Sequence, residues 1–140
     1  MIYCNSVWGH CKKNALNPLI VTHKKILRAL AGVCNNYPTF QIFEDTRLLT
    51  LDNINKYMVG IFVYKCLQDL DFSLWFSQEN PSYFTRFMST NPLSVPRIRN
   101  VHTEQCILYR GAVIWNHIPL EIRNKSYETF KCNFKAFLNG

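Results

Sequence analysis

Lys24, Lys25 and Arg28 stand close together and form the clearest candidate binding site in the sequence. Residues 1–31 contain no acidic residue, and the whole chain of 140 residues has a formal net charge of +7. Lysine and arginine suit phosphate groups, because each neutralised phosphate releases its counterions. The pattern predicts weak, salt-dependent binding to a nucleic-acid backbone without sequence preference. The alternative is a basic helix face that is only solvated.

The acidic residues form no recognisable catalytic site. Glu44 is adjacent to Asp45, and Asp69 lies two residues before Asp71, but neither pair has a neighbouring histidine or glycine-rich loop. Two-metal and acid–base mechanisms need clustered carboxylates. The familiar nucleophile, P-loop and zinc-protease motifs are also missing from the sequence. We therefore predict that the chain is not an enzyme, has no catalytic residue and no cofactor, and takes no small-molecule substrate.

Cys4, His10 and Cys11 form the tightest cluster of potential metal ligands. A structural zinc site normally needs a second ligand pair downstream, and the sequence has none at a matching spacing. The predicted metal site is therefore none, and a small zinc module stays as an alternative. The six cysteines are scattered and form no C-x-x-C pair, so we expect free and mostly buried thiols.

The elements that must position these residues follow from apolar spacing and capping signals. An amphipathic helix is predicted from Asn17-Pro18 to Gly32, with the basic residues on its polar side. A short helical turn follows Thr39, and the rings of Phe40 and Phe43 are expected to pack back on the first helix. A second long helix is predicted after Thr50 or Asp52, with its buried stripe running from Ile54 to Leu67. Gly60 is expected to be a tolerated weak point in this helix.

The second half of the chain contains a loop-rich insertion and two more helices. The insertion is predicted over residues 69–100. A helix over residues 110–116 is expected to stop before Pro119, and Ser126 is expected to cap a last helix with an aromatic stripe. The fold class is mostly α: one small helical domain over residues 1–140, with packed amphipathic helices and at most one short strand or hairpin. The predicted core is Trp8, Ile26, Leu30, Phe43, Ile61, Phe62, Trp115, Phe130 and Phe134.

The longest nearly continuous apolar run covers only Met58 to Tyr64. This run is far shorter than the roughly 20 residues that span a bilayer. The N-terminal residues also lack the basic and apolar regions of a secretory signal peptide. We therefore expect no membrane association and an intracellular protein, either cytoplasmic or nuclear.

Several short motifs occur in a fixed order along the chain. They are Val7-Trp8-Gly9, the helix motif from His23 to Arg28, then Trp115-Asn116-x-x-Pro119-x-x-Ile122-Arg123, and finally Phe130-Lys131. This order resembles the segment that follows the palm in reverse transcriptases of non-LTR retrotransposons of the jockey-like and LINE-type groups. The resemblance covers roughly residues 2–138, and Trp115-Asn116 with Pro119 is its most specific part.

The resemblance implies a thumb and post-thumb tail without the catalytic palm. The chain would then be a non-catalytic C-terminal fragment of an RNA-directed DNA polymerase, whose partners are nucleic acid and the missing polymerase domains. His23 and Ile118 depart from the family pattern, where Gln and Leu are usual, which indicates a divergent or decaying copy. We interpret Trp115, Asn116 and Pro119 as structural residues: an indole in the core, an amide that satisfies backbone groups at the helix end, and a helix stop.

A free-standing basic helical domain that binds DNA or acts as an adaptor is the alternative function. A helix-turn-helix protein would join its two helices by a turn of three or four residues. Here residues 32–39 separate the predicted helices and include Pro38, which disfavours that motif.

Overall fold

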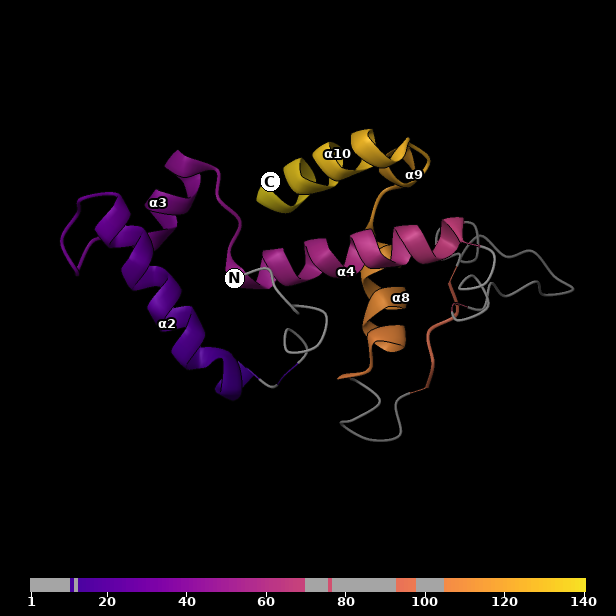
Figure 1. The fold of residues 1–140 in the computed structure, drawn as a ribbon, viewed down its shortest axis with the longest axis horizontal. Helices are drawn as coiled ribbons and strands as arrows, with labels where there is room; N and C mark the ends of the chain where they lie inside the picture. The colour runs from indigo at the N-terminus through magenta and orange to yellow at the C-terminus, as the bar shows by residue number, and fades with distance from the viewer. Residues whose placement is uncertain (1–10, 12, 70–75, 77–92, 98–104) are drawn as a thin grey trace, which may run out of the picture.

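A computed structural model describes residues 11, 13–69, 76, 93–97 and 105–140 of the chain. The described residues form six helices and no strand, which confirms the predicted mostly α class (Figure 1). The helices are α2 (Lys13–Leu30), α3 (Thr39–Thr46), α4 (Leu51–Gln68), α8 (Ile107–His117), α9 (Leu120–Arg123) and α10 (Tyr127–Asn139). None of them is long and apolar enough to cross a membrane.

Helix α4 is the centre of the fold, and it packs against both α8 and α10 (Figure 1). Its buried residues include Val59, Val63, Tyr64 and Cys66, whereas much of the predicted stripe, Ile61 and Phe62 among it, is only half-buried. The residues of α4 that are buried therefore lie on a different side of the helix from the predicted stripe. The reason is that α4 is covered from two directions, so apolar residues occur over most of its circumference and a single stripe cannot be identified.

An aromatic cluster joins α4, α8 and α10. The Tyr64 ring lies 4.6 Å from the Phe130 ring, and Trp115 lies 5.8 Å from Phe130 between ring centroids. Phe130 lies 5.4 Å from Phe134 by the same measure. Trp115, Phe130 and Phe134 are all buried, which confirms their predicted place in the core.

Helix α2 packs on α3 and contributes no residue to the main core cluster. The prediction that Ile26 and Leu30 belong to the core is therefore wrong, since 43% and 80% of their surface is exposed. Phe43 is half-buried and its ring lies 5.8 Å from that of His23, as expected of a ring packed on the first helix. Phe40 is 60% exposed, and no ring contact joins it to α2 among the described residues. Trp8 lies outside the described residues.

The ends of α2 differ in how well they were predicted. The helix begins at Lys13 and contains Pro18, so the predicted start at Asn17-Pro18 is wrong. Pro18 is the sixth residue of α2, past the unpaired N–H groups of the first turn, so it removes one backbone hydrogen bond, the one to Asn14 O. The C-terminal stop at Gly32 is confirmed: its φ is 65°, and Val33 N donates to Arg28 O at 3.1 Å, as in a Schellman motif.

Two further helix starts were predicted correctly in position. Thr50 is the N-cap of α4, and its hydroxyl accepts a hydrogen bond from Asn53 N at 3.3 Å. Ser126 is the N-cap of α10, but its hydroxyl pairs with Thr129 Oγ1 at 3.0 Å instead of a backbone N–H. The predicted insertion over residues 69–100 lies largely outside the described residues. Among the described residues of this segment, Phe76 and Leu93 are buried in the core.

Candidate nucleic-acid-binding surface

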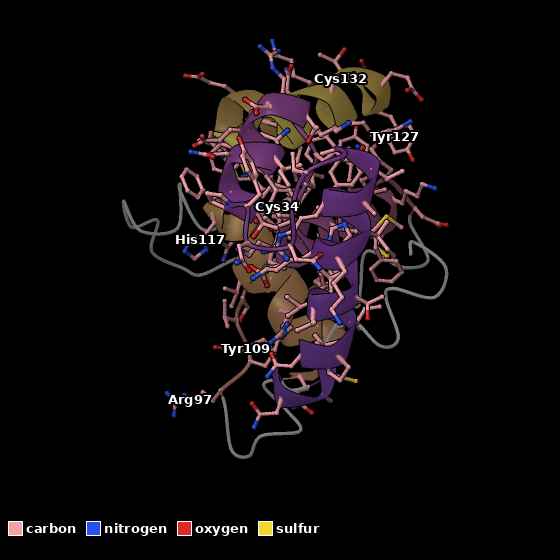
Figure 2. The ribbon with its side chains drawn as sticks, turned by 90° about the vertical axis from the view of Figure 1, so that its left-hand side faces the viewer. Cys34, Arg97, Tyr109, His117, Tyr127 and Cys132 are labelled. Carbon is pink, nitrogen blue, oxygen red and sulfur yellow. The ribbon has the colours of Figure 1, made fainter. Side chains whose placement is uncertain are left out.

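The three predicted site residues lie on α2, the helix turned toward the viewer in Figure 2. Lys24 and Lys25 are exposed, and no described residue forms a salt bridge with either ammonium group. The ion pairs found on the described surface involve other lysines: Lys56 with Asp52, and Lys131 with Glu128. Both predicted lysines are therefore available to an external anion.

Arg28 has a different role from the two lysines. Its side chain is half-buried, and its Nε donates a hydrogen bond to Tyr37 O at 3.0 Å. This bond attaches the loop after α2 to the helix. Arg28 therefore contributes to the fold as well as to the positive charge of this face, which the sequence pattern did not indicate.

The motif around Trp115 and Asn116 is a structural junction. The Asn116 side-chain amide forms two hydrogen bonds with the backbone of Leu93: Oδ1 accepts from Leu93 N at 3.2 Å and Nδ2 donates to Leu93 O at 2.9 Å. The structural interpretation of Asn116 is confirmed, but its partner is a remote segment and not the helix end. The Asn116 side chain carries both a donor and an acceptor, so it can pair with the N–H and the C=O of a single residue in another segment.

Arg123 belongs to the same junction, and the sequence reasoning missed its role. The side chain is buried, its Nε donates to Ile118 O, and its Nη2 donates to Asn116 O at 3.0 Å. Burial lowers the pKa of this guanidinium. Charged groups are rarely buried unless they are hydrogen-bonded. The only signal in the sequence was the place of Arg123 in the motif, four residues after Pro119.

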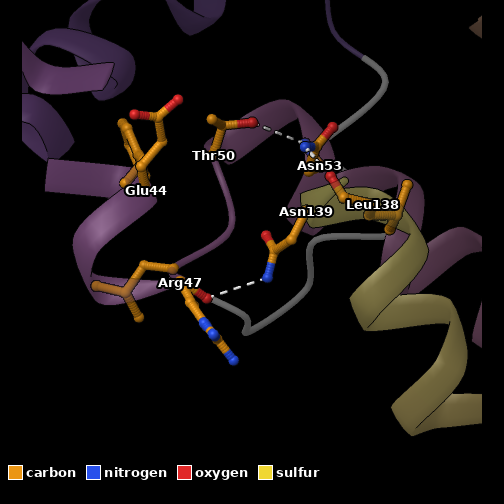
Figure 3. Close-up of a pocket in the computed structure, with 8 residues that line it drawn as sticks. Glu44, Arg47, Thr50, Asn53, Leu138 and Asn139 are labelled. Carbon is orange, nitrogen blue, oxygen red and sulfur yellow. Dashed lines mark hydrogen bonds between the residues drawn. The ribbon is translucent and has the colours of Figure 1, made fainter. Parts of the chain in front are cut away.

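A small cavity of about 130 Å³ lies where α3, α4 and α10 meet (Figure 3). Its polar groups bind one another. Asn139 Nδ2 donates to Arg47 O at 3.1 Å, and Asn53 Nδ2 donates to Leu138 O at 2.7 Å. These bonds connect the end of α10 to α4 and to the loop after α3. We therefore interpret the cavity as a junction where helices pack, and not as a reactive site.

The described residues contain no group of three or more histidine, cysteine or acidic side chains that could hold a metal ion. Cys4 and His10, from the cluster that the sequence offered, lie outside the described residues. The expectation of mostly buried thiols is wrong for the described part: Cys66 is buried, but Cys11, Cys34, Cys106 and Cys132 are exposed. Burial, with a smaller contribution from Asp69, raises the pKa of the Cys66 thiol.

Comparisons with protein-family models, with curated proteins and with solved structures find no match to this chain. The features of this chain that point to a function are therefore the surface of α2 and the order of the sequence motifs.

Proposed function

We propose that this chain binds the phosphate backbone of nucleic acids through α2, as the non-catalytic C-terminal segment of a non-LTR reverse transcriptase. The observation that carries the proposal is the exposure of Lys24 and Lys25 on a helix that contains no acidic residue. Arg28 adds a third positive charge one turn after Lys24. The order of the motifs from Trp8 to Lys131 supports the assignment to this kind of polymerase.

The position of α2 supports this role. The helix lies at one side of the molecule beside α3, away from α8 (Figure 1). A duplex approaching this side meets the helix without displacing the aromatic core. Lysine contacts to phosphates carry no sequence information, so the expected binding is weak and not specific.

The loop between α2 and α3 argues against a helix-turn-helix reader of bases. Residues 31–38 separate the two helices, which is longer than the turn of three or four residues in that motif. We therefore assign the basic face of α2 to contacts with the phosphate backbone of the nucleic acid.

A salt titration tests the proposal. Binding of a fluorescently labelled duplex is measured by anisotropy as a function of salt, for the wild type and for a Lys24→Ala, Lys25→Ala double variant. Each lost phosphate contact lowers the log–log salt slope by about 0.9, so the double variant should lose about 1.8. Arg28→Ala is tested separately, because its hydrogen bond to Tyr37 also holds the loop.

The matched control is Lys125→Ala, Lys135→Ala. Lys125 is exposed just before α10, and Lys135 is exposed within α10. Their removal changes the net charge by the same two units. The proposal expects a slope close to that of the wild type for this control. An equal loss for both double variants would mean that overall charge drives the binding, and an unchanged slope for the α2 variant would remove α2 from the interface.

A further inference from the structure

Phe40 presents an aromatic ring to solvent at the start of α3. It is the second residue of this helix, and 60% of its surface is exposed. Ile42, two residues later, is only 3% exposed and belongs to the buried side of α3. Since one turn takes 3.6 residues, two positions that differ by two lie on nearly opposite sides of a helix. The Phe40 side chain therefore lies on the outer side of α3.

The loop between α2 and α3 holds Phe40 close to the positive charges of α2. The Nε atom of Arg28 donates to Tyr37 O at 3.0 Å, and Tyr37 stands three residues before Phe40. The loop is also closed by a hydrogen bond from Tyr37 N to Cys34 O at 3.0 Å. Three residues of chain span at most about 11 Å. The backbone of Phe40 therefore lies within about that distance of the residue to which Arg28 is bonded.

Lys24 and Arg28 form a cationic row that leads toward this loop. They are four residues apart in α2, so they lie about 40° apart around the helix axis and about 6 Å apart along it. Arg28 is the later of the two and lies in the last turn of the helix, which ends at Leu30. The hydrogen bond to Tyr37 uses one of the five N–H donors of its guanidinium group, so the group retains donors for a phosphate.

We propose that the α2 surface binds single-stranded nucleic acid, with phosphates on Lys24 and Arg28 and an unpaired base stacked on the ring of Phe40. Proteins that bind single strands combine a positive track for the backbone with aromatic rings on which bases stack. Inside a duplex the neighbouring base pairs cover the faces of each base, so the ring has nothing to stack on. The preference rests on the proposed function, because one aromatic ring without phosphate contacts would not hold a strand.

The charges on α3 limit the length of this site. Glu44 and Asp45 are exposed one turn and more after Phe40, toward the end of α3 that is remote from the loop. These carboxylates repel phosphates, so a strand that follows the cationic row is not expected to continue along α3 past the ring. Stacking on Phe40 is tolerant of sequence, because every base has an aromatic face. The site therefore suits a short unpaired stretch of any sequence.

Fluorescence anisotropy at low salt tests the proposal with a labelled oligothymidylate and with the same strand annealed to its complement. Phe40→Ala should weaken binding of the single strand by about 5- to 150-fold, the range expected for losing one stacked base. Its binding to the duplex should match that of the wild type. The salt slope for the single strand should also stay unchanged, because the substitution removes no phosphate contact.

Two further variants separate stacking from packing. Phe40→Leu keeps an apolar side chain but has no aromatic face, so it should lose single-strand binding as Phe40→Ala does. Phe40→Trp keeps an aromatic face and should retain binding. The melting temperatures of these variants should stay close to that of the wild type, because the side chain is 60% exposed. Wild-type affinity in Phe40→Leu would overturn the stacking role.

Phe137→Ala is the matched control. Phe137 is also an exposed aromatic residue, with 45% of its surface in solvent, but it lies on α10. This variant should bind the single strand like the wild type, and a loss equal to that of Phe40→Ala would overturn the proposal.

The comparison of single strand and duplex also distinguishes this proposal from the proposed function. Equal losses of both ligands in Phe40→Ala would mean that the ring positions α2, and would overturn stacking. Unchanged single-strand binding, with a duplex salt slope that still depends on Lys24 and Lys25, would overturn stacking alone. A wild type that binds neither ligand would overturn both proposals.

Discussion

Gly60 allows an aromatic ring of α10 to reach the backbone of α4. A Cβ atom at this position would lie 2.3 Å from Phe134 Cε1. Phe134 cannot easily move away, because it is buried and its ring stacks on Phe130 and Tyr57. The expectation that Gly60 is a tolerated weak point is therefore wrong: the missing side chain is what permits the close contact between the helices.

Replacing Gly60 with alanine should destabilise the protein by about 1–3 kcal/mol through overpacking. Helix propensity alone would give the opposite sign, a gain of about 1 kcal/mol. Urea unfolding followed by circular dichroism measures the difference. The same substitution in a Phe134→Leu background should cost much less, because the smaller side chain leaves room for the new methyl group. A stabilised single variant would show that α4 and α10 are further apart than described.

At the scale of elements, α2 and α3 meet through His23 and Phe43. Partial burial lowers the pKa of His23 below its ordinary value of 6.5. The exposed carboxylates of α3, Glu44 and Asp45, do not reverse this direction. The unfolded chain therefore takes up a proton at a higher pH than the folded chain does. Well above pH 6.5 the protonation of His23 contributes nothing to the free energy of unfolding. As the pH falls through that value, it lowers the free energy of unfolding.

The melting temperature should fall more steeply with decreasing pH in the wild type than in His23→Gln. The comparison runs from above pH 6.5, where His23 is uncharged in the folded and in the unfolded chain, to well below that pH. The other histidines are present in both proteins, so the difference between the two curves isolates His23. Parallel curves would contradict a desolvated His23 at the contact between α2 and α3.

Helix ends were predictable where their signals are local. Gly32 and Thr50 each act on the backbone within a few residues, and both ends lie where the sequence places them. The buried faces of α2 and α4 were less predictable, because they depend on which other elements pack against these helices. Ile26 and Leu30 have the spacing of core residues, but the chain brings no described element against them.

The candidate site was predictable to a similar extent. Exposure of Lys24 and Lys25 followed from helical spacing and from the absence of acidic residues. The hydrogen bond from Arg28 to Tyr37 O did not, because it spans an irregular loop. The pairing of Asn116 with Leu93 also joins segments whose distance in sequence carries no periodic signal.

At the scale of the whole molecule, the helices form a body and an arm. Helices α4, α8, α9 and α10 supply the main core, together with Phe76 and Leu93. Helices α2 and α3 form the arm, which joins the body through the loop that contains Arg47 (Figure 1). Arg47 has a φ of 51°, in the left-handed region, and its carbonyl accepts a hydrogen bond from Asn139. The proposed binding surface thus lies on the arm and the stability of the fold comes from the body.

The full chain should show no template-directed DNA synthesis, because the sequence offers no recognisable cluster of carboxylates for a two-metal mechanism. Primer extension with Mg²⁺ and purified protein measures this, with a preparation of an unrelated protein purified in the same way as the control. Incorporation that depends on the template and exceeds the control would require a catalytic site in this chain.

The contact of α10 with α4 has a consequence for biosynthesis. Tyr64 donates to Lys125 O at 2.9 Å and Asn53 donates to Leu138 O, so the partners of α4 come 61 and 85 residues later in the chain. The ribosome therefore completes α4 long before the residues that cover it exist. During that interval Tyr57 and Tyr64 lack their aromatic neighbours from α10. Such non-local contacts form late, and the uncovered apolar surface of the nascent chain is where a chaperone would bind.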